Sequence, residues 1–342
     1  EDAAHSGVLG QSPILFFNVT PAALHYKLCK DVLAYARENG NGLAIVTEKP
    51  FTISVDQATE IAQELASLGA AFAMNMTCEN AEFRPLVGDM LAKLRRTHDV
   101  TSIYTSLGTN HLDDPRMRVD PRTGHPGISG VPDEVVHLLR VARLCPEFEN
   151  IRLDYANVSE GAVSDERPNF RYAVDGVWSS VERPDLKMHV WSGFNWENYQ
   201  CPVIIELTSR EDPTQRKFLQ LDYDAPKTYY DGWVLMHEDG TKDSYVHIDQ
   251  ETHIPPNARG LKKLSSMVSE NVAEFNDFIQ RGDPRIPLGP NGIESAVMLQ
   301  QNISPLQDDP APGNVRVWRQ DGPIPVVPAP LPDLRQLPDI TP

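Results

Sequence analysis

The chain has 342 residues and a mass of 38.2 kDa, which is enough for two domains or one large one. Hydrophobic residues make up 40 % of it and charged residues 23 %, so we expect a folded protein with a sizeable core rather than a disordered chain. The formal net charge is −17, and such an acidic surface repels nucleic-acid phosphates and anionic lipid heads. Sequence-specific nucleic-acid binding and membrane association are therefore disfavoured.

No segment approaches the roughly 20 apolar residues of a transmembrane helix, so we expect a virion or cytoplasmic protein that does not span a membrane. The four cysteines are far apart and include no CxxC pair, which excludes a zinc ribbon and a thioredoxin-like site. They are too few for a disulfide scaffold, and buried free thiols are predicted. These cysteines are Cys29, Cys78, Cys145 and Cys201.

Residues 1–150 are predicted to be mainly helical, because apolar residues recur there at intervals of three and four. Thr20 followed by Pro21 is typical of a helix start, and Gly40 of a helix end. Ser54 with Gln57 three residues later forms a capping box for a second helix. The predicted helices cover about 21–40, 54–68, 82–96 and 132–145, with a possible strand at 43–47.

From about Asn169 to Thr252 the pattern changes to short runs of period two, which is typical of antiparallel strands. An amphipathic helix is predicted to follow, from Leu261 to a stop at Gly282. Residues 284–342 hold 13 of the 29 prolines, which favours an extended arm over regular helix or central strand. The strands are predicted at Phe170–Val174, Met188–Ser192, Val203–Thr208, Phe218–Tyr223, Trp233–His237 and Tyr245–Asp249.

The predicted fold class is α+β. It comprises a helical N-terminal layer, a central mostly antiparallel sheet, a long C-terminal helix and an extended proline-rich arm. Regions 1–150 and 151–283 are expected to pack together as one large domain, with 284–342 as the arm.

The sequence contains none of the common catalytic or nucleotide-binding motifs. Neither GxGxxG nor GxxxxGK[ST] occurs, and Gly40-Asn41-Gly42 follows a predicted helix instead of a strand, which suits a helix end. A GxSxG nucleophile elbow is also missing. Cys201 could pair with His189 in space, but its apolar neighbours favour a buried structural thiol. The sequence therefore predicts no catalytic residue and no cofactor.

Two groups of histidines were considered as metal ligands. On a strand His247 and Asp249 share a face, as in several iron sites, but a second distant histidine is needed. His253 is the last histidine of the chain, so only His237 on a neighbouring strand could supply it. In the loop 110–130, arginines alternate with the possible ligands His111, Asp113, Asp114 and His125. That mixture favours a salt-bridged surface loop.

Without a catalytic constellation, the leading hypothesis is a structural subunit of a large homo-oligomeric assembly, most of all a viral capsid or coat protein. Its partner would be itself in many copies, with the arm crossing onto neighbouring subunits. The alternative is a soluble enzyme or secreted effector with a site around His237, His247, Asp249 and His253. A binding module that presents a polyproline ligand is a third class. The expected assembly contacts are Trp196, Tyr199, Trp318, Pro325, Val327 and Pro330.

Overall fold

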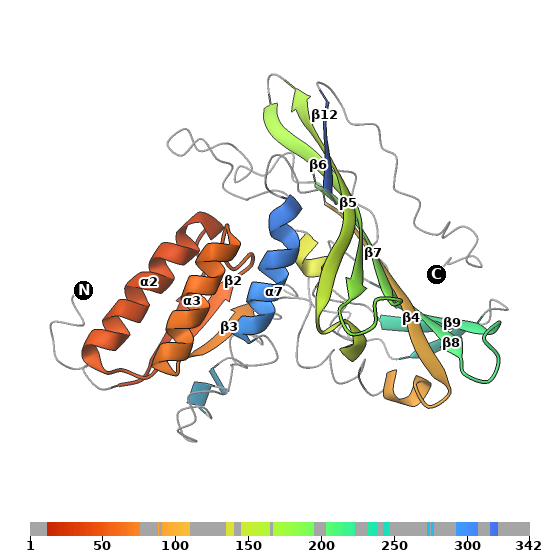
Figure 1. Ribbon diagram of the computed structural model, residues 1–342, viewed down its shortest axis with the longest axis horizontal. Coiled ribbons are helices and arrows are strands. Elements are labelled where there is room, and N and C mark those ends of the chain that lie inside the picture. Colours follow the sequence, from red (N-terminus) through yellow and green to blue (C-terminus); the bar gives the residue numbers. More distant parts are fainter. Residues whose placement is uncertain are drawn as a thin grey trace, which may run out of the picture. The chain divides into compact units, whose positions relative to one another are not determined.

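The chain forms two compact units in a computed structural model (Figure 1). Unit 1 comprises residues 1–77 and 263–304, and unit 2 comprises 78–262 and 305–342. The boundaries at residues 150 and 283 are predicted from the hydrophobic pattern of the sequence, whereas the two units are defined by contacts. The predicted boundaries stay a prediction. The structure describes residues 12–75, 88, 91–109, 135–139, 145–164, 167–194, 203–222, 232–237, 242–245, 272–273, 275–276, 292–306 and 315–320.

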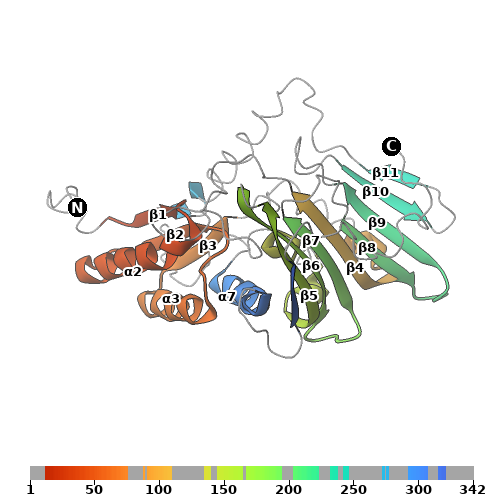
Figure 2. The same cartoon turned by 90° about the horizontal axis from the view of Figure 1, so that it is seen from above.

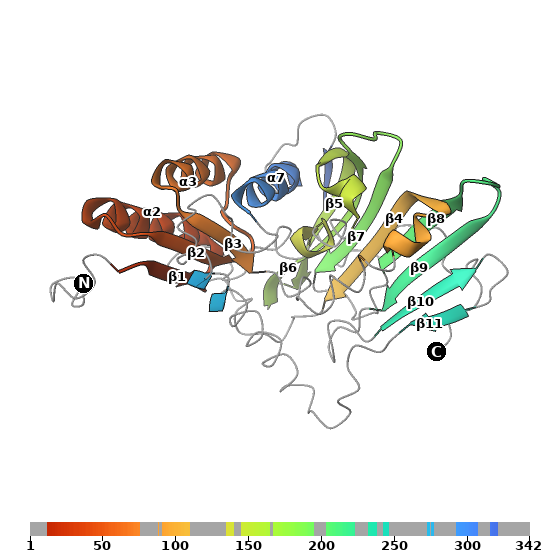
Figure 3. The same cartoon turned by 90° about the horizontal axis from the view of Figure 1, so that it is seen from below.

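Unit 1 is built on a parallel sheet in which strands alternate with helices along the chain. The order is β1 (Ile14–Asn18), α2 (Ala22–Asn39), β2 (Leu43–Glu48), α3 (Val55–Leu68) and β3 (Ala71–Asn75), with the strands adjacent as β1-β2-β3. Right-handed crossovers that all run in one direction along a sheet place their helices on the same face. Figure 3 shows α2 and α3 on one side of β1, β2 and β3. Helix α7 (Ile293–Ile303) packs against α3 and β3.

The termini of the first two helices confirm the predicted capping box and both glycine ends, whereas the N-cap of α2 is Pro21, without a side-chain cap, and not Thr20 as expected. Gly40 and Gly69 follow α2 and α3 in the left-handed conformation, with φ of 66° and 61°. Glycine adopts such angles without the steric cost that a Cβ brings. The Ser54 side chain accepts a hydrogen bond from the backbone N–H of Gln57, as the capping box requires. The strand expected at 43–47 is confirmed as β2.

Both faces of the unit 1 sheet are covered. Cys29, Leu33, Ile61 and Leu65 are buried on the helices. A separate cluster consists of small buried residues of β2 and β3, against which larger side chains pack: Ala44, Val46, Ala71 and Ala73, with Leu15, Phe17 and Phe275. Parallel strands buried on two faces are continuously apolar instead of alternating, which explains the run in β2.

Unit 2 is built on a mixed nine-stranded sheet in the order β11-β10-β9-β8-β4-β7-β6-β5-β12 (Figure 2). β4 pairs in parallel with β7, and β5 with β12; the remaining neighbours are antiparallel. A short 3-10 turn, η2 (Pro146–Phe148), precedes β5. The strands are β4 (His98–Thr109), β5 (Ile151–Ser164), β6 (Arg167–Ser180), β7 (Lys187–Phe194), β8 (Val203–Ser209), β9 (Arg216–Asp222), β10 (Gly232–His237), β11 (Lys242–Tyr245) and β12 (Val315–Gln320).

The predicted mixture of helices and strands is confirmed, but three parts of the predicted layering are wrong. The N-terminal part is not a helical layer, because parallel strands alternate with its helices. The arm contains α7, the turn η3 (Ser304–Leu306) and β12. α7 and β12 lie in the proline-free windows 291–304 and 313–322, and Pro305 falls in the turn η3; a proline count over the whole arm concealed these windows.

The third correction concerns the long C-terminal helix. Within the expected span from Leu261 to Gly282 the structure describes only 272–273 and 275–276, which are helical. The C-terminal helix that it does describe is α7, further along the chain. Among the described helices, none is long and apolar enough to cross a membrane.

Candidate functional site

The strands of unit 1 all end at one edge of their sheet. Asn18 lies opposite Thr47 in the register of β1 and β2, and Glu48 lies opposite Asn75 in that of β2 and β3. In open α/β sheets, ligands bind outside the carboxyl ends of the parallel strands. We call residues 18–21 and 47–54 the carboxyl edge, and it is the candidate site of this unit.

A buried histidine ties the two turns of the carboxyl edge together. His25 lies in the first turns of α2 and is 0 % exposed. Its Nε2 is 2.6 Å from the carbonyl oxygen of Thr20, and its Nδ1 is 2.9 Å from that of Pro50. Because one ring bridges the turn after β1 and the turn after β2, it fixes their relative positions.

The buried side chain of Asn18 stabilises the turn after β1 through hydrogen bonds. Its side-chain amide donates to the carbonyl oxygen of His25 at 3.2 Å and lies 3.7 Å from the sulfur of Cys29. The Thr20 hydroxyl donates to the side-chain oxygen Oδ1 of Asn18 at 2.7 Å. Burial raises the pKa of the Cys29 thiol to about 11, so this cysteine stays protonated at neutral pH. The turn is held by its own polar groups.

Charged side chains follow β2 at the centre of the carboxyl edge. Glu48 is the last residue of that strand and Lys49 the next, and both are half-buried. Pro50 is buried, and the peptide bond that joins it to Lys49 is cis. The Pro50 carbonyl is hydrogen-bonded to His25, which anchors the backbone next to Lys49. A lysine on an anchored backbone can exchange a proton with a bound molecule.

The carboxyl edge does not build a phosphate cradle. Helix N-termini bind phosphate where a glycine turn lets free backbone N–H groups approach it. The turn before α2 has the sequence Asn-Val-Thr-Pro, without glycine, and Pro21 has no N–H. At α3 the Ser54 hydroxyl occupies the backbone N–H of Gln57.

Unit 2 brings together a polar group that the sequence had not suggested. The rings of Tyr104 and His189 stack with centroids 4.9 Å apart, and the Tyr104 hydroxyl donates to Glu206 at 3.1 Å. Arg216 pairs with the same carboxylate at 3.3 Å. Burial lowers the pKa of His189 and raises that of Tyr104. Neighbouring strands β4, β7, β8 and β9 supply these side chains, so only the strand order reveals the group.

Most of the predicted site residues lie outside the described part of the chain. This holds for His247, Asp249 and His253, for the histidine loop 110–130, and for Cys201. His237 ends β10 opposite Lys217. No group of three potential ligands that could hold a metal ion exists among the described residues. The metal site therefore stays a prediction.

The predicted assembly contacts are untested in the same way. Trp196, Tyr199, Pro325, Val327 and Pro330 lie outside the described residues. Trp318 belongs to β12, where it lies opposite Ser159 of the same chain. Cys29 and Cys145, the two described cysteines, are free and buried, as predicted. Association of copies with one another stays a prediction.

Neither a protein-family model nor a curated protein matches the chain. Solved structures do match it. KijD10, a 3-ketoreductase from Actinomadura kijaniata in complex with NADP and TDP-benzene, has a TM-score of 0.62 at 14% identity, covering 89% of this chain and 79% of its own. A super-repressor mutant of Gal80p from Saccharomyces cerevisiae has 0.58 at 14% identity, covering 86% and 80%. The aldose-aldose oxidoreductase from Caulobacter crescentus has 0.55 at 13% identity, covering 84% and 74%.

These matches overturn the prediction of a viral capsid or coat protein. Enzymes recur among the matched structures, and parts of the supposed assembly arm form elements of the two units, namely α7 and β12. The enzyme alternative agrees better with the fold. At such low identity the likeness concerns the fold alone, which the chain shares with these solved structures.

Proposed function

We propose that this protein is an oxidoreductase that acts on a carbohydrate, with Lys49 as the group that transfers a proton to or from the reacting oxygen. The fold supports the reaction class. Among the matched structures are a 3-ketoreductase, an aldose-aldose oxidoreductase and a UDP-N-acetylglucosamine 3-dehydrogenase from Acidithiobacillus ferrooxidans.

The position of Lys49 is the observation that carries the proposal. It follows β2, the middle of three parallel strands, at the edge where ligands of such sheets bind. When an alcohol is oxidised to a ketone, its oxygen loses a proton while its carbon loses a hydride. A half-buried lysine amine on an anchored backbone can take that proton, and its ammonium can return it in reduction.

The carboxyl edge accounts for the proton and not for the hydride. In the matched 3-ketoreductase structure NADP is bound, and such a dinucleotide supplies or accepts a hydride when bound. The described turns do not fit its pyrophosphate, because they lack glycine and use their own side chains at the helix starts. No dinucleotide site is therefore assigned to these residues.

A second candidate is a regulatory protein that binds a carbohydrate without converting it. Gal80p shows that the fold also occurs in a repressor. Such a protein would bind a sugar at the carboxyl edge and show no turnover with any dinucleotide. The two candidates therefore differ in one measurable property.

The test follows conversion of aldoses and nucleotide-linked sugars by NMR, with NAD or NADP supplied in solution. The proposal predicts turnover by the wild-type protein and a loss of about 100-fold or more in kcat for Lys49→Met. Lys27→Met is the control, because Lys27 is an exposed α2 lysine paired with Asp31. Absence of turnover with retained sugar binding would favour the regulatory candidate. Equal kcat in wild type and Lys49→Met would exclude the role of Lys49.

A further inference from the structure

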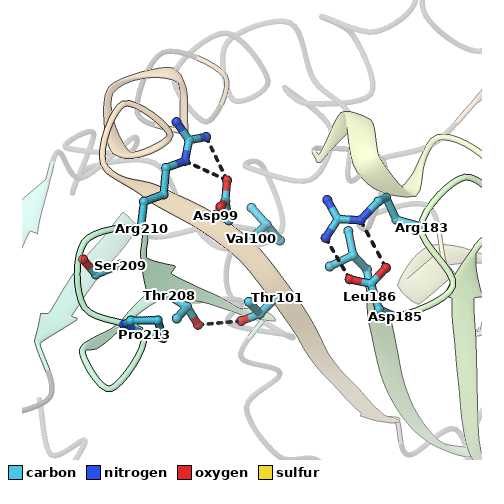
Figure 4. A pocket seen from close by; sticks show the side chains of 10 residues that line it. All are labelled: Asp99, Val100, Thr101, Arg183, Asp185, Leu186, Thr208, Ser209, Arg210 and Pro213. Atoms are coloured by element: carbon cyan, nitrogen blue, oxygen red, sulfur yellow. Dashed lines mark hydrogen bonds and ion pairs between the residues drawn. The ribbon is translucent and has the colours of Figure 1, made fainter.

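Unit 2 contains a hollow of about 370 Å³ at one end of its large sheet, separate from the carboxyl edge of unit 1. β4 lies between β7 and β8, and the hollow forms where β4 starts, β8 ends and the chain turns into β7 (Figure 4). Its volume lies within the range of about 300–1,000 Å³ that is typical of small-molecule sites. The residues that line it are Asp99, Val100, Thr101, Arg183, Asp185, Leu186, Thr208, Ser209, Arg210 and Pro213.

A β-bulge shapes the wall of this hollow. Val100 lies opposite Leu207 and Ser102 opposite Glu206, so Thr101 is an extra residue in β4 without a partner in the register. Its hydroxyl lies 3.3 Å from that of Thr208, which also lines the hollow. Bulges occur preferentially beside functional sites, where they redirect a side chain.

Two ion pairs face the hollow from different sides. Arg210 donates from Nε and Nη2 to one oxygen of Asp99, at 2.9 and 2.8 Å. Arg183 donates from the same two atoms to both oxygens of Asp185, at 3.1 and 2.7 Å. Figure 4 shows the two pairs on separate segments of chain. The charged lining therefore sums to zero, with each guanidinium held in place by its own carboxylate.

The intact pairs retain hydrogen-bonding capacity. Among the described residues, the Nη1 groups of Arg183 and Arg210 and the Oδ2 atom of Asp99 have no partner. Guanidinium groups only donate and carboxylates only accept, so the hollow offers fixed donors beside a fixed acceptor. Val100, Leu186 and Pro213 add apolar surface between them.

From this lining we infer that the hollow is a binding site for a neutral polyhydroxylated molecule of monosaccharide size. Hydroxyl groups both donate and accept, so such a molecule can bond to the unused Nη1 and Oδ2 atoms while both ion pairs stay intact. Its C–H groups can contact the apolar lining. An anion at the Nη1 groups would lie beside the carboxylates of Asp99 and Asp185, which repel it, so a neutral ligand is favoured. The inference concerns unit 2 alone and does not depend on the proposed function.

The test titrates the full-length protein with glucose, galactose, mannose, xylose and myo-inositol, and separately with inorganic phosphate, by calorimetry. At least one neutral compound is expected to bind with a Kd of about 1 mM or tighter. Asp99→Asn and Arg183→Met each remove a charge-assisted hydrogen bond and are expected to weaken binding about tenfold or more. Roughly half of each ion-paired side chain is exposed, so both variants should fold, which circular dichroism checks.

Two controls locate the binding. Asp31→Asn breaks an exposed ion pair on α2 and should not change the Kd, whereas Lys49→Met reports any sugar that binds at the carboxyl edge. The inference is overturned if none of the neutral compounds binds, if phosphate alone binds, or if affinity survives both Asp99→Asn and Arg183→Met. Weakening by Lys49→Met but not by the hollow variants would place the sugar in unit 1 and also overturn it.

Discussion

Replacing His25 by leucine tests whether one buried ring holds the carboxyl edge together. The ring is 0 % exposed and bonds to the carbonyl oxygens of Thr20 and Pro50. Leucine fills much of the same space but leaves both carbonyls without this partner. An imidazole with a single N–H donates to only one of these two carbonyl oxygens at a time, so leucine removes one hydrogen bond. An unsatisfied buried polar group costs about 1–3 kcal/mol, which is the expected loss in the free energy of unfolding. His25→Gln, which can still donate from its amide, should lose roughly half as much.

Urea denaturation followed by tryptophan fluorescence and circular dichroism measures this loss. Lys27→Met is the matched control on the same helix, because its ion pair is largely exposed and such pairs contribute at most about 1 kcal/mol. The His25→Leu protein should also lose activity under conditions where it is still folded, because the two turns of the carboxyl edge are no longer joined. If the free energy of unfolding of His25→Leu lies within about 0.5 kcal/mol of wild type, His25 does not hold the two turns together.

Further predictions concern both units. Gly176→Ala should destabilise the protein by about 1–3 kcal/mol in urea titrations, because the new Cβ would lie 2.6 Å from the buried Trp178 ring. Ser54→Ala should lower the free energy of unfolding by about 1 kcal/mol, because the helix cap is lost. Ser54→Asp should keep most of the stability, since aspartate also caps helices. Burial raises the pKa of Asp175 in the folded protein above its pKa in the unfolded chain. The folded state therefore binds this proton more tightly, and the free energy of unfolding falls as the pH rises from the lower pKa through the higher one. Asp175→Asn should remove that fall and be the more stable protein at pH 7. Cys29 should resist alkylation at pH 8 until the protein unfolds.

The helices of unit 1 could be predicted from the sequence because their ends carry local signals. Proline at the start of α2, the capping box of α3 and the glycines after both act within a few residues. β1 and β3 were missed since an apolar run of five residues suits a short strand or a buried helix turn equally well. α7 and β12 were missed because proline was counted over the whole arm.

The candidate site was missed for a related reason. Apolar runs at 14–17, 43–47 and 71–74, separated by two helices, form a βαβαβ pattern, which predicts a parallel sheet. That pattern would have placed Lys49 at a ligand-binding edge. No motif marks this lysine, because lysine after a strand has no characteristic spacing. The hollow of unit 2 depends on strand order, which places β4 between β7 and β8 although β7 and β8 lie far along the chain from it.

Protection of Lys49 by substrate is the most direct test of the carboxyl edge as the reaction site. The protein is acetylated with a limiting amine reagent, with and without a saturating sugar identified by the turnover screen, and each lysine is quantified by mass spectrometry. The account predicts that the sugar slows acetylation of Lys49 several-fold while that of the exposed Lys27 stays unchanged. Equal rates at Lys49 with and without a sugar that the protein converts would contradict it.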